Sequence, residues 1–381
     1  MNNSLKRNTK EELYIFAPNL DFVLSHRKDL LNKLTNAYKI TLFTDTSNFN
    51  NIVEANLSSL KIKNLKMRSH KRSLKILTSF TYMKSCLKKI QGSSAKKVIF
   101  ITAEISLFGM IISRFLPAKL YFLITGTQIL FDKNGFISIQ TILKFVIKYL
   151  LKKDGVNFIF QNEDDKSNFK DKFGLSARSI IIEGSGVQIE KIKYISRDFN
   201  DEIKILFAGS LFSHKGVYEF YNAAKLLSNN LDNISFHIAG RYYPNNSQSI
   251  THELFQKIKN SDFITFHGAW NKHEFVENLK RFEIFILPSY GEGLPLSVIE
   301  AMLSGMPILA SDVAGCKSCV ENSNNGYLFK AKSISELVDA IKKITKNRNS
   351  LHSMGLSSRE IAVQKFNLDL IYSHYISFLE N

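Results

Sequence analysis

Short apolar runs alternate with helical patterns along most of the chain. The first series of strand-like runs lies at residues 13–17, 40–43, 98–102, 120–124, 158–160 and 179–182. A second series lies at residues 204–208, 235–239, 263–267, 282–287, 308–310 and 327–329. Such alternation is typical of parallel sheets whose strands are joined by crossover helices. The pattern therefore predicts an α/β fold with two doubly wound domains.

The boundary between the two series predicts the domain limits. Residues 188–202 are polar and rich in charge, so we expect them to form a linker between domains at 1–187 and 203–365. Helical patterns at 351–366 and 368–379 predict two helices near the end of the chain. Because ligands of doubly wound sheets bind beyond the carboxyl ends of the strands, we expect a site in a cleft between the domains.

The length and the apolar content are those of an ordinary soluble chain. With 381 residues, 44% of them hydrophobic, the chain is long enough to bury two cores. The first ten residues are polar and do not form the apolar region of a secretory leader. The longest apolar tract, 98–131, contains three charged residues, so it predicts two buried strands around a helix rather than a membrane span. We expect a cytoplasmic protein.

The net charge of +17 is concentrated in the first half of the chain. Residues 1–180 contain 30 Lys and Arg against 13 Asp and Glu, whereas the remainder has 21 of each. Basic clusters lie at 61–72, 84–97 and 144–153. Nucleic acid is not the expected partner, because neither zinc-finger spacing nor an aromatic RNA-binding motif accompanies the charge. An anionic membrane surface fits such clusters better, which predicts a peripheral location on the inner face of the membrane.

Residues 137–153 show the pattern of a helix at a membrane interface. Apolar residues recur at helical spacing, and Lys144, Lys148, Lys152 and Lys153 lie along another side. A core helix with a solvated basic edge is the alternative interpretation, and residues 73–90 show the same ambiguity.

The segment 288–310 carries the most specific chemistry. An apolar run leads into a glycine-rich turn, and Pro295 suits the first turn of the helix that follows. The free N–H groups and positive dipole end of such a helix form a ready site for a diphosphate. Glu292 and Glu300, separated by seven residues, can hold sugar hydroxyls.

A second loop offers a cation for the same diphosphate. The run at 205–208 continues into G-S-L-F-S-H-K-G, which presents Lys215 at the start of a helix. A lysine there can neutralise a diphosphate as a point charge. Arg241 also follows a strand-like run and could project towards the same ligand.

The three cysteines do not form an even disulfide framework and fit a reducing compartment. They are Cys86, Cys316 and Cys319. The last two form a C-x-x-C, but a second pair of zinc ligands is missing beside it. We expect neither a metal nor redox chemistry there.

The sequence around Glu292 and Glu300 resembles the E-x7-E signature of family 4 of the retaining GT-B glycosyltransferases. Other segments follow in family order over most of the chain. The resemblance implies two Rossmann-like domains facing a central cleft, with the last helix, 366–381, crossing back to the first domain. It also implies that Glu292 meets the donor sugar, that Glu300 meets the ribose, and that the backbone amides of Gly293 and Leu294 lie near the sugar and diphosphate.

The resemblance assigns further donor-side residues. Family members read G-R-L at the loop of Gly209, and the arginine clamps the leaving diphosphate together with the lysine that Lys215 matches. Ser210 occupies the arginine position here. That change removes a bidentate donor, and replacement of the missing guanidinium by Arg241 is one hypothesis. The segment ending in Ala269 and Trp270 resembles the family loop that contacts the base.

The resemblance also names candidates on the acceptor side. His26 and Arg27 follow the first strand, Arg68 lies in K-M-R-S, and Thr125 and Gly126 open T-G-T-Q-I-L-F. All five fall in segments that follow the family order.

Within the family, this sequence most resembles enzymes of bacterial glycan, capsule or O-antigen assembly. These enzymes transfer N-acetylhexosamine or hexose to an undecaprenyl-diphosphate-linked sugar. We therefore expect a retaining transferase with two partners. One is a nucleotide sugar, which the resemblance implies to be UDP-linked, and the other is a polyprenyl-diphosphate-linked saccharide. Because the chain contains no D-x-D triplet, we expect neither a metal nor another cofactor.

Several alternatives stay open. The donor could be a GDP-sugar, as in mannosyl-type transferases, or the protein could be a degenerate GT-B member that binds membrane without catalysis. A glycoside hydrolase needs two carboxylates roughly 5 to 9.5 Å apart. Eight helical steps would separate Glu292 from Glu300 by about 12 Å, which disfavours that chemistry. A sugar phosphorylase is disfavoured because a pyridoxal-phosphate lysine motif is not evident.

Overall fold

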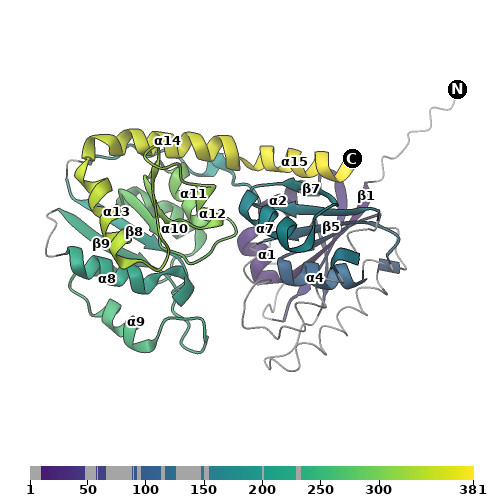
Figure 1. The fold of residues 1–381 in the computed structure, drawn as a ribbon, viewed down its shortest axis with the longest axis horizontal. Coiled ribbons are helices and arrows are strands. Elements are labelled where there is room, and N and C mark those ends of the chain that lie inside the picture. Colours follow the sequence, from purple (N-terminus) through teal and green to yellow (C-terminus); the bar gives the residue numbers. More distant parts are fainter. Residues whose placement is uncertain are drawn as a thin grey trace. The chain divides into compact units, whose positions relative to one another are not determined.

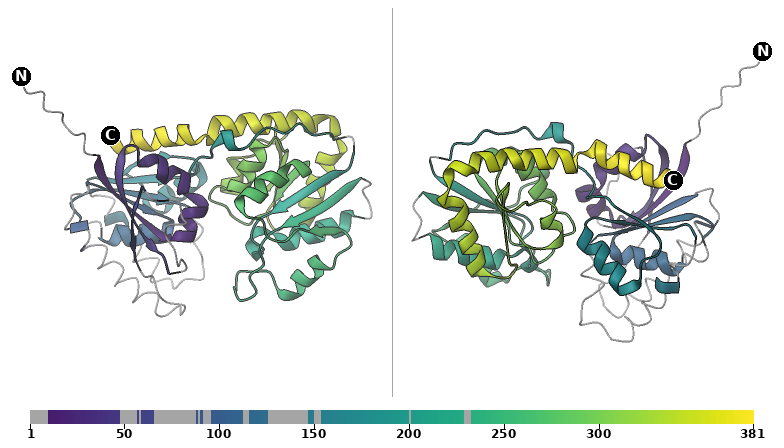
Figure 2. Two further views of the ribbon diagram at one scale, coloured as in Figure 1. Left: turned by 180° about the vertical axis from the view of Figure 1, so that it is seen from behind. Right: turned by 45° about the horizontal axis from the view of Figure 1, so that its top comes forward.

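The chain folds into two compact units. The computed structural model describes residues 10–47, 57, 59–65, 88, 90–91, 96–112, 116–125, 147–149, 154–199, 201–228 and 233–381. The first unit comprises Met1–Gly186 and Ile371–Asn381, and the second comprises Val187–Leu370. Each unit contains a parallel sheet flanked by helices, as Figures 1 and 2 show.

The first unit is built on a seven-stranded sheet in the order β3-β2-β1-β4-β5-β6-β7. Its strands are β1 (Glu11–Asn19), β2 (Tyr38–Asp45), β3 (Lys61–Asn64), β4 (Lys97–Ile101), β5 (Lys119–Ile124), β6 (Val156–Phe160) and β7 (Arg178–Ile181). Its helices include α1 (Leu20–His26), α2 (Lys28–Leu34), α4 (Ala103–Ile112) and α7 (Glu163–Phe173). The six predicted strands and the helix within the apolar tract are confirmed. Strand β3 was not predicted, because its lysines fall within a basic cluster.

A row of phenylalanines crosses one face of this sheet. Phe43, Phe16, Phe100, Phe122 and Phe158 occupy register-paired positions on neighbouring strands. Successive ring centroids lie 4.5 to 5.5 Å apart. A Cβ at Gly109 of α4 would lie only 2.5 Å from the Phe100 ring, so the helix packs directly on this row. Aromatic contacts across adjacent strands thus fix the register of the core.

The second unit contains a six-stranded parallel sheet in the order β10-β9-β8-β11-β12-β13. The strands are β8 (Ile203–Ala208), β9 (Ile234–Ala239), β10 (Ile264–Phe266), β11 (Ile284–Leu287), β12 (Ile308–Ser311) and β13 (Gly326–Phe329). Its helices are α8 (Val217–Leu227), α9 (His252–Lys259), α10 (Lys272–Asn278), α11 (Leu296–Leu303), α12 (Ala314–Lys317), α13 (Ile334–Lys346) and α14 (Arg348–Phe366). Short 3-10 turns are η3 (Ile189–Lys191), η4 (Ser213–Lys215) and η5 (Leu279–Arg281). All six strands match the second predicted series.

The stretch expected as a linker packs on the second unit. Arg197 is buried, and its guanidinium donates to the backbone oxygens of Phe282 at 2.7 Å and Ser304 at 2.6 Å. Burial lowers the pKa of Arg197 to about 10, which leaves it charged at neutral pH. Residues 188–199 are therefore held by hydrogen bonds to this unit, and their role as a linker stays a prediction.

The last helix, α15 (Leu368–Glu380), supplies residues to the first unit from Ile371 onward. The Tyr121 hydroxyl donates to the Leu379 carbonyl at 3.1 Å. The Arg178 guanidinium lies 4.4 Å from the ring centroid of Phe378. These contacts hold the end of the chain against β5 and β7.

The basic segments proposed for membrane contact lie mostly outside the described residues. The structure does not describe most residues of four segments, 61–72, 73–90, 84–97 and 137–153, and Cys86 and Lys144 are among those left out. The membrane hypothesis therefore stays a prediction. Among the helices that the structure describes, none is both long enough and apolar enough to cross a membrane.

Candidate functional site

Lys215 and Glu292 meet at the carboxyl ends of β8 and β11. Lys215 ends η4, just before α8, and Glu292 lies in the glycine-rich loop before α11. The Lys215 Nζ lies 2.6 Å from the Glu292 Oε1, with 24% and 11% of the two side chains exposed. The two charges predicted to serve the donor therefore form one ion pair that still reaches solvent.

Close backbone contact brings these two loops together. Gly216 has φ of 75°, and a Cβ there would lie 2.0 Å from the Pro288 carbonyl oxygen. The Tyr290 N–H donates to the His214 carbonyl at 2.8 Å. Only glycine fits this conformation and this approach, so the K-G sequence is needed to place Lys215 against the glycine-rich loop.

The glycine-rich loop is supported from α12 as well. The Gly315 N–H donates to the Glu292 carbonyl at 3.2 Å. A Cβ at Gly315 would lie 2.5 Å from the Gly293 carbonyl oxygen and 2.6 Å from that of Glu292. A side chain at position 315 would thus push the loop away from Lys215.

The N-terminus of α11 carries no side-chain cap. Pro295 is the N-cap residue, so it precedes the first helical residue. The sequence had predicted that it lies within the first turn. By contrast, Thr251 caps α9 and Asn271 caps α10 through side-chain oxygens. An uncapped helix start beside Lys215 offers backbone N–H groups to an anion.

Glu300 lies on α11 and is 5% exposed. Its Oε1 lies 3.5 Å from the Nζ of Lys272, whose side chain is 62% exposed. Lys272 is the first residue of α10, and sequence analysis missed it. Its position could have suggested it, because Lys272 follows by two residues Trp270, which was already assigned to the loop that contacts the base.

A pocket of about 260 Å³ collects most of the other donor-side candidates. Gly209, Ser210, Arg241, Ala269 and Trp270 all line it. They come from the loops after β8, β9 and β10, which pack closely because a Cβ at position 240 would lie 2.0 Å from the backbone oxygen at position 209. The Ser at position 297 of α11 also lines the pocket. The structure therefore brings the loop of Ala269 and Trp270, predicted to contact the base, next to the loop in which Ser210 replaces the family's arginine.

Trp270 has a packing role as well as a place in this pocket. Its ring centroid lies 5.2 Å from that of His267 and 6.1 Å from that of Phe282. Behind it, the Nδ1 of His237 lies 3.1 Å from the Nε2 of His267. Burial, followed by the neighbouring His267, lowers the pKa of His237 to about 4. The histidine pair is thus neutral at physiological pH.

His214 lies next to the ion pair. Burial, followed by the charge of Lys215, lowers the pKa of its imidazole. A neutral His214 leaves Lys215 as the cation of this loop.

The acceptor-side candidates all belong to the first unit. His26 is exposed at the end of α1, and its Nδ1 lies 3.2 Å from the Phe22 carbonyl. Arg27 is only 3% exposed, and its guanidinium donates to the Ser185 hydroxyl at 2.6 Å. Thr125 is half-buried after β5. Arg68 and Gly126 lie outside the described residues.

The C-x-x-C segment is part of the core. Cys316 and Cys319 are not joined in a disulfide, and neither has exposed surface. Burial raises the pKa of the Cys316 thiol well above its ordinary value, so it stays protonated. Within the part of the chain that the structure describes, no group of three or more His, Cys, Asp or Glu side chains is arranged to hold a metal ion.

Comparisons with known proteins connect this site to sugar transfer. Residues 188–361 match the family of glycosyl transferases group 1. The N,N'-diacetylbacillosaminyl-diphospho-undecaprenol alpha-1,3-N-acetylgalactosaminyltransferase of Campylobacter jejuni is 27% identical over 80% of this chain and 81% of that protein. The UDP-Gal:alpha-D-GlcNAc-diphosphoundecaprenol alpha-1,3-galactosyltransferase of Escherichia coli is 25% identical over 66% of this chain and 67% of that protein.

Solved structures share the architecture of both units. Sucrose-phosphate synthase from Thermosynechococcus elongatus aligns with a TM-score of 0.78 at 15% identity, over 97% of this chain and 98% of that chain. The Anabaena protein HepE, solved in complex with UDP, aligns with a TM-score of 0.74 at 16% identity, over 97% of this chain and 99% of that chain. The predicted fold, two parallel-sheet α/β units of the GT-B type, is confirmed.

Proposed function

We propose that this glycosyltransferase, whose residues 188–361 form a glycosyl transferases group 1 domain, moves a hexose or N-acetylhexosamine from a nucleotide sugar to a lipid-diphosphate-linked saccharide. One observation carries the proposal: the Lys215–Glu292 ion pair stands beside the uncapped start of α11. That arrangement offers a cation and backbone N–H groups for a diphosphate, next to a carboxylate for sugar hydroxyls. The activities of the two transferase relatives support the choice of acceptor.

In the proposed reaction, Lys215 and the α11 N-terminus stabilise the negative charge of the departing diphosphate. Glu292 accepts hydrogen bonds from donor hydroxyls, while its ion pair keeps Lys215 in position. The bond between the anomeric carbon and the diphosphate oxygen breaks, and the acceptor oxygen forms its bond on the same face. The acceptor's proton passes to the leaving phosphate oxygen, so the step retains configuration and needs neither a protein base nor a metal.

The nucleoside half of the donor is proposed to occupy the pocket of about 260 Å³. Trp270 and Ala269 border the base, and Arg241 compensates for the guanidinium that Ser210 lacks. Glu300 accepts hydrogen bonds from the ribose hydroxyls, and Lys272 holds its carboxylate at 3.5 Å. UDP is the proposed nucleotide, since HepE, a structure of the same fold, was solved with UDP.

The place of action is part of the proposal. The excess of basic residues in the first half of the chain supports contact with an anionic membrane, where a lipid-linked acceptor would reside. We therefore propose a peripheral enzyme of surface polysaccharide assembly on the cytoplasmic face.

A transfer assay tests this function. The purified chain is given a synthetic undecaprenyl-diphosphate-linked N-acetylhexosamine and radiolabelled UDP-sugars, GDP-mannose as the competing donor class, and either EDTA or Mg²⁺. We expect product from one UDP-sugar with equal yield in EDTA, and an unchanged anomeric configuration by NMR. Transfer from GDP-mannose alone, an inverted product or a strict need for Mg²⁺ would contradict the corresponding part of the proposal.

A variant links the assay to the site. Glu300→Ala should weaken nucleotide binding about 10- to 100-fold, because the ribose loses a charged acceptor. Unaltered affinity would remove Glu300 from the site.

A further inference from the structure

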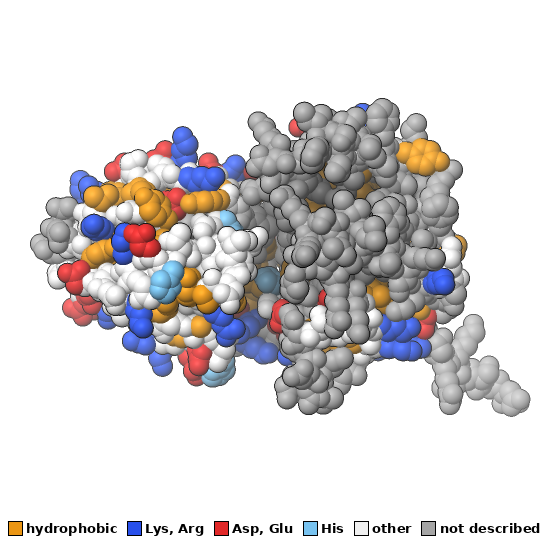
Figure 3. All heavy atoms as spheres, turned by 90° about the horizontal axis from the view of Figure 1, so that it is seen from below, with side chains coloured by type: hydrophobic (Ala, Val, Ile, Leu, Met, Phe, Trp, Pro, Cys, Tyr) orange, Lys and Arg blue, Asp and Glu red, His pale blue; other side chains and the backbone are white. Residues whose placement is uncertain are grey.

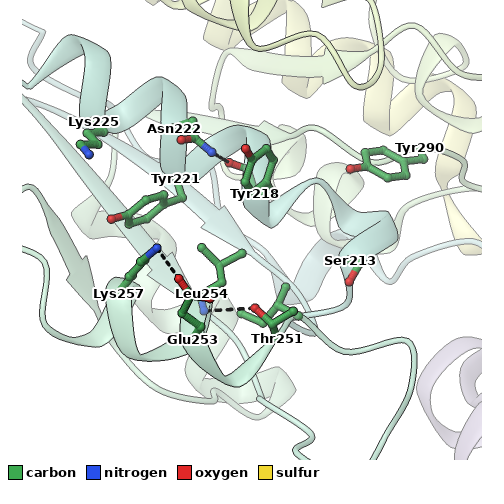
Figure 4. Close-up of a pocket in the computed structure, with 11 residues that line it drawn as sticks. Ser213, Tyr218, Tyr221, Asn222, Lys225, Thr251, Glu253, Leu254, Lys257 and Tyr290 are labelled. Carbon is green, nitrogen blue, oxygen red and sulfur yellow. Dashed lines mark hydrogen bonds and ion pairs between the residues drawn. The ribbon is translucent and has the colours of Figure 1, made fainter.

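A second pocket in the same unit lies apart from the one assigned to the nucleotide. It has a volume of about 440 Å³ and lies between α8 and α9, as Figure 4 shows. None of its lining residues is shared with the pocket that contains Trp270. Its size is within the range typical of small-molecule sites.

Tyrosines supply the flat apolar surface of this pocket. Tyr218 and Tyr221 project from α8, and Tyr290 borders the pocket from the glycine-rich loop (Figure 4). The Tyr290 ring is held in place, because its hydroxyl donates to Glu219 at 2.7 Å and Lys332 lies 4.7 Å from its centroid. Tyr218 is 54% exposed, although an aromatic ring of this size gains from being covered.

Polar groups surround these rings. Glu253 and Lys257 of α9 form an ion pair at 2.6 Å, and the Asn222 amide donates to the Tyr218 carbonyl at 2.8 Å. Among the residues that the structure describes, the hydroxyls of Tyr218 and Tyr221 and the ammonium of Lys225 make no hydrogen bond to protein. The pocket therefore offers ring faces together with donors and acceptors that a ligand can use.

Apolar and charged side chains also lie side by side on the surface of the second unit outside the pocket. Figure 3 shows hydrophobic side chains reaching the surface of the second unit among Lys, Arg, Asp and Glu side chains. A ligand that fits here must be polar at its edges and apolar on a face.

We propose that the pocket between α8 and α9 is a saccharide-binding site that takes a hexopyranose unit of a glycan. A pyranose presents an apolar face of C–H groups, which matches a tyrosine ring, and a rim of hydroxyls, which matches Asn222, Lys225 and Glu253. A phosphorylated ligand fits less well, since Thr251 already caps the start of α9 and the Lys257 ammonium is paired.

The position of the pocket connects it to the proposed reaction. Ser213 of η4 borders it two residues before Lys215, and Tyr290 borders it two residues before Glu292. A glycan held here would lie beside the loops that bind the donor, without entering the nucleotide pocket. The choice of a saccharide as ligand class rests on the proposed function.

Equilibrium binding to the full chain tests the site without requiring transfer. The probes are the methyl α-glycosides of glucose, galactose, N-acetylglucosamine and N-acetylgalactosamine, followed by saturation-transfer-difference NMR in the absence of nucleotide. We expect millimolar binding of at least one glycoside, with saturation concentrated on one face of its ring. Tyr218→Ala should weaken that binding about two- to ten-fold, whereas Tyr218→Phe keeps the ring and should retain it.

Matched variants separate this site from the donor site. Leu226→Ala removes another exposed apolar side chain of α8 that does not border the pocket, so it should leave binding unchanged. Lys215→Ala should also leave glycoside binding unchanged, because Lys215 does not border the pocket. Glycoside binding can therefore be observed even if the transferase proposal fails. Absence of binding by all four glycosides would overturn the inference, as would equal affinity in wild type and Tyr218→Ala.

Discussion

The two units share a parallel-sheet framework but differ in how their candidate residues are held. In the second unit, Lys215 pairs with Glu292 at 2.6 Å, and Lys272 stands 3.5 Å from Glu300. In the first unit, Arg27 is buried against Ser185, and His26 contacts its own helix. Charges in the second unit are thus arranged around loops that reach solvent, whereas Arg27 stabilises the interior.

Binding of a diphosphate explains why the loops of the second unit lie so close together. A diphosphate needs a cation and free backbone N–H groups within a few ångströms, so the loops of the second unit must meet closely. Gly216 and Gly315 provide that approach, because a Cβ at either would overlap a carbonyl oxygen.

The largest expected effect comes from removing the cation of the second unit. Lys215→Ala should lower the rate of transfer about 10²- to 10³-fold, because the departing diphosphate loses a charge that stabilises it. Glu292→Gln should also lower the rate, since the amide can neither hold Lys215 electrostatically nor accept as strongly. Initial rates at saturating donor and acceptor measure both.

Lys346→Ala, at an exposed position on α13, is the matched control and should retain the wild-type rate. Because Lys215→Ala leaves the Glu292 carboxylate, whose side chain is only 11% exposed, without this partner, far-UV circular dichroism should first show that the variant is folded. A Lys215→Ala rate within about two-fold of wild type would show that Lys215 does not stabilise the departing diphosphate.

The next effect should fall on stability. Arg27→Ala removes a buried guanidinium that donates to Ser185, so we expect the free energy of unfolding of the first unit to fall by about 2 to 3 kcal/mol. Denaturant titration followed by far-UV circular dichroism measures it. Nucleotide affinity should stay at the wild-type value. A stable Arg27→Ala protein whose acceptor KM rises would instead make Arg27 a ligand-binding residue.

A smaller effect concerns the missing arginine of the second unit. Ser210→Arg should tighten UDP binding by about three- to ten-fold, because a guanidinium can bind a diphosphate in a bidentate manner. Arg241→Ala should weaken binding in the wild type but have less effect in the Ser210→Arg background, because one guanidinium replaces the other. Calorimetric titration of the four proteins gives the coupling energy. Strict additivity would show that Arg241 does not compensate for Ser210.

The smallest expected effect is a dependence of stability on pH. Burial lowers the pKa of His237 to about 4 in the folded protein, below its ordinary value of 6.5. The unfolded chain therefore binds a proton more readily, so the folded state is favoured above pH 6.5 and loses this stability as the pH falls from about 6.5 towards 4. His237→Phe should reduce the decline of Tm over that range by about 2 to 4 °C. His352→Gln, at an exposed position, should not change it.

The fold was predictable from sequence because its signals are local. Each buried strand is a short apolar run, and the two series of runs indicated two parallel sheets. The strand at Lys61–Asn64 was not predicted because it lies at the edge of the sheet and two of its four residues are lysines, so it has little apolar sequence. The row of phenylalanines in the first unit depends on register, which periodicity alone does not give.

The candidate donor site was predictable to the extent that motifs bring residues together within a loop. Glu292, Glu300 and Lys215 were found because glycine-rich turns and helix starts accompany them. Lys272 was missed because its contact with Glu300 depends on how α10 packs beside α11. The burial of Arg27 was missed for a similar reason, since Ser185 lies far from it in sequence.

Thermal stabilisation by nucleotides tests directly whether Lys215 and Glu300 belong to a nucleotide-binding site. Wild type, Glu300→Ala and Lys215→Ala are melted in EDTA with UDP, GDP, ADP, CMP and their sugar conjugates, because ligands that bind the folded state raise Tm. We expect UDP and one UDP-sugar to stabilise the wild type selectively, and both variants to lose most of this stabilisation. An unchanged Tm with every nucleotide, or equal stabilisation of the variants, would contradict it.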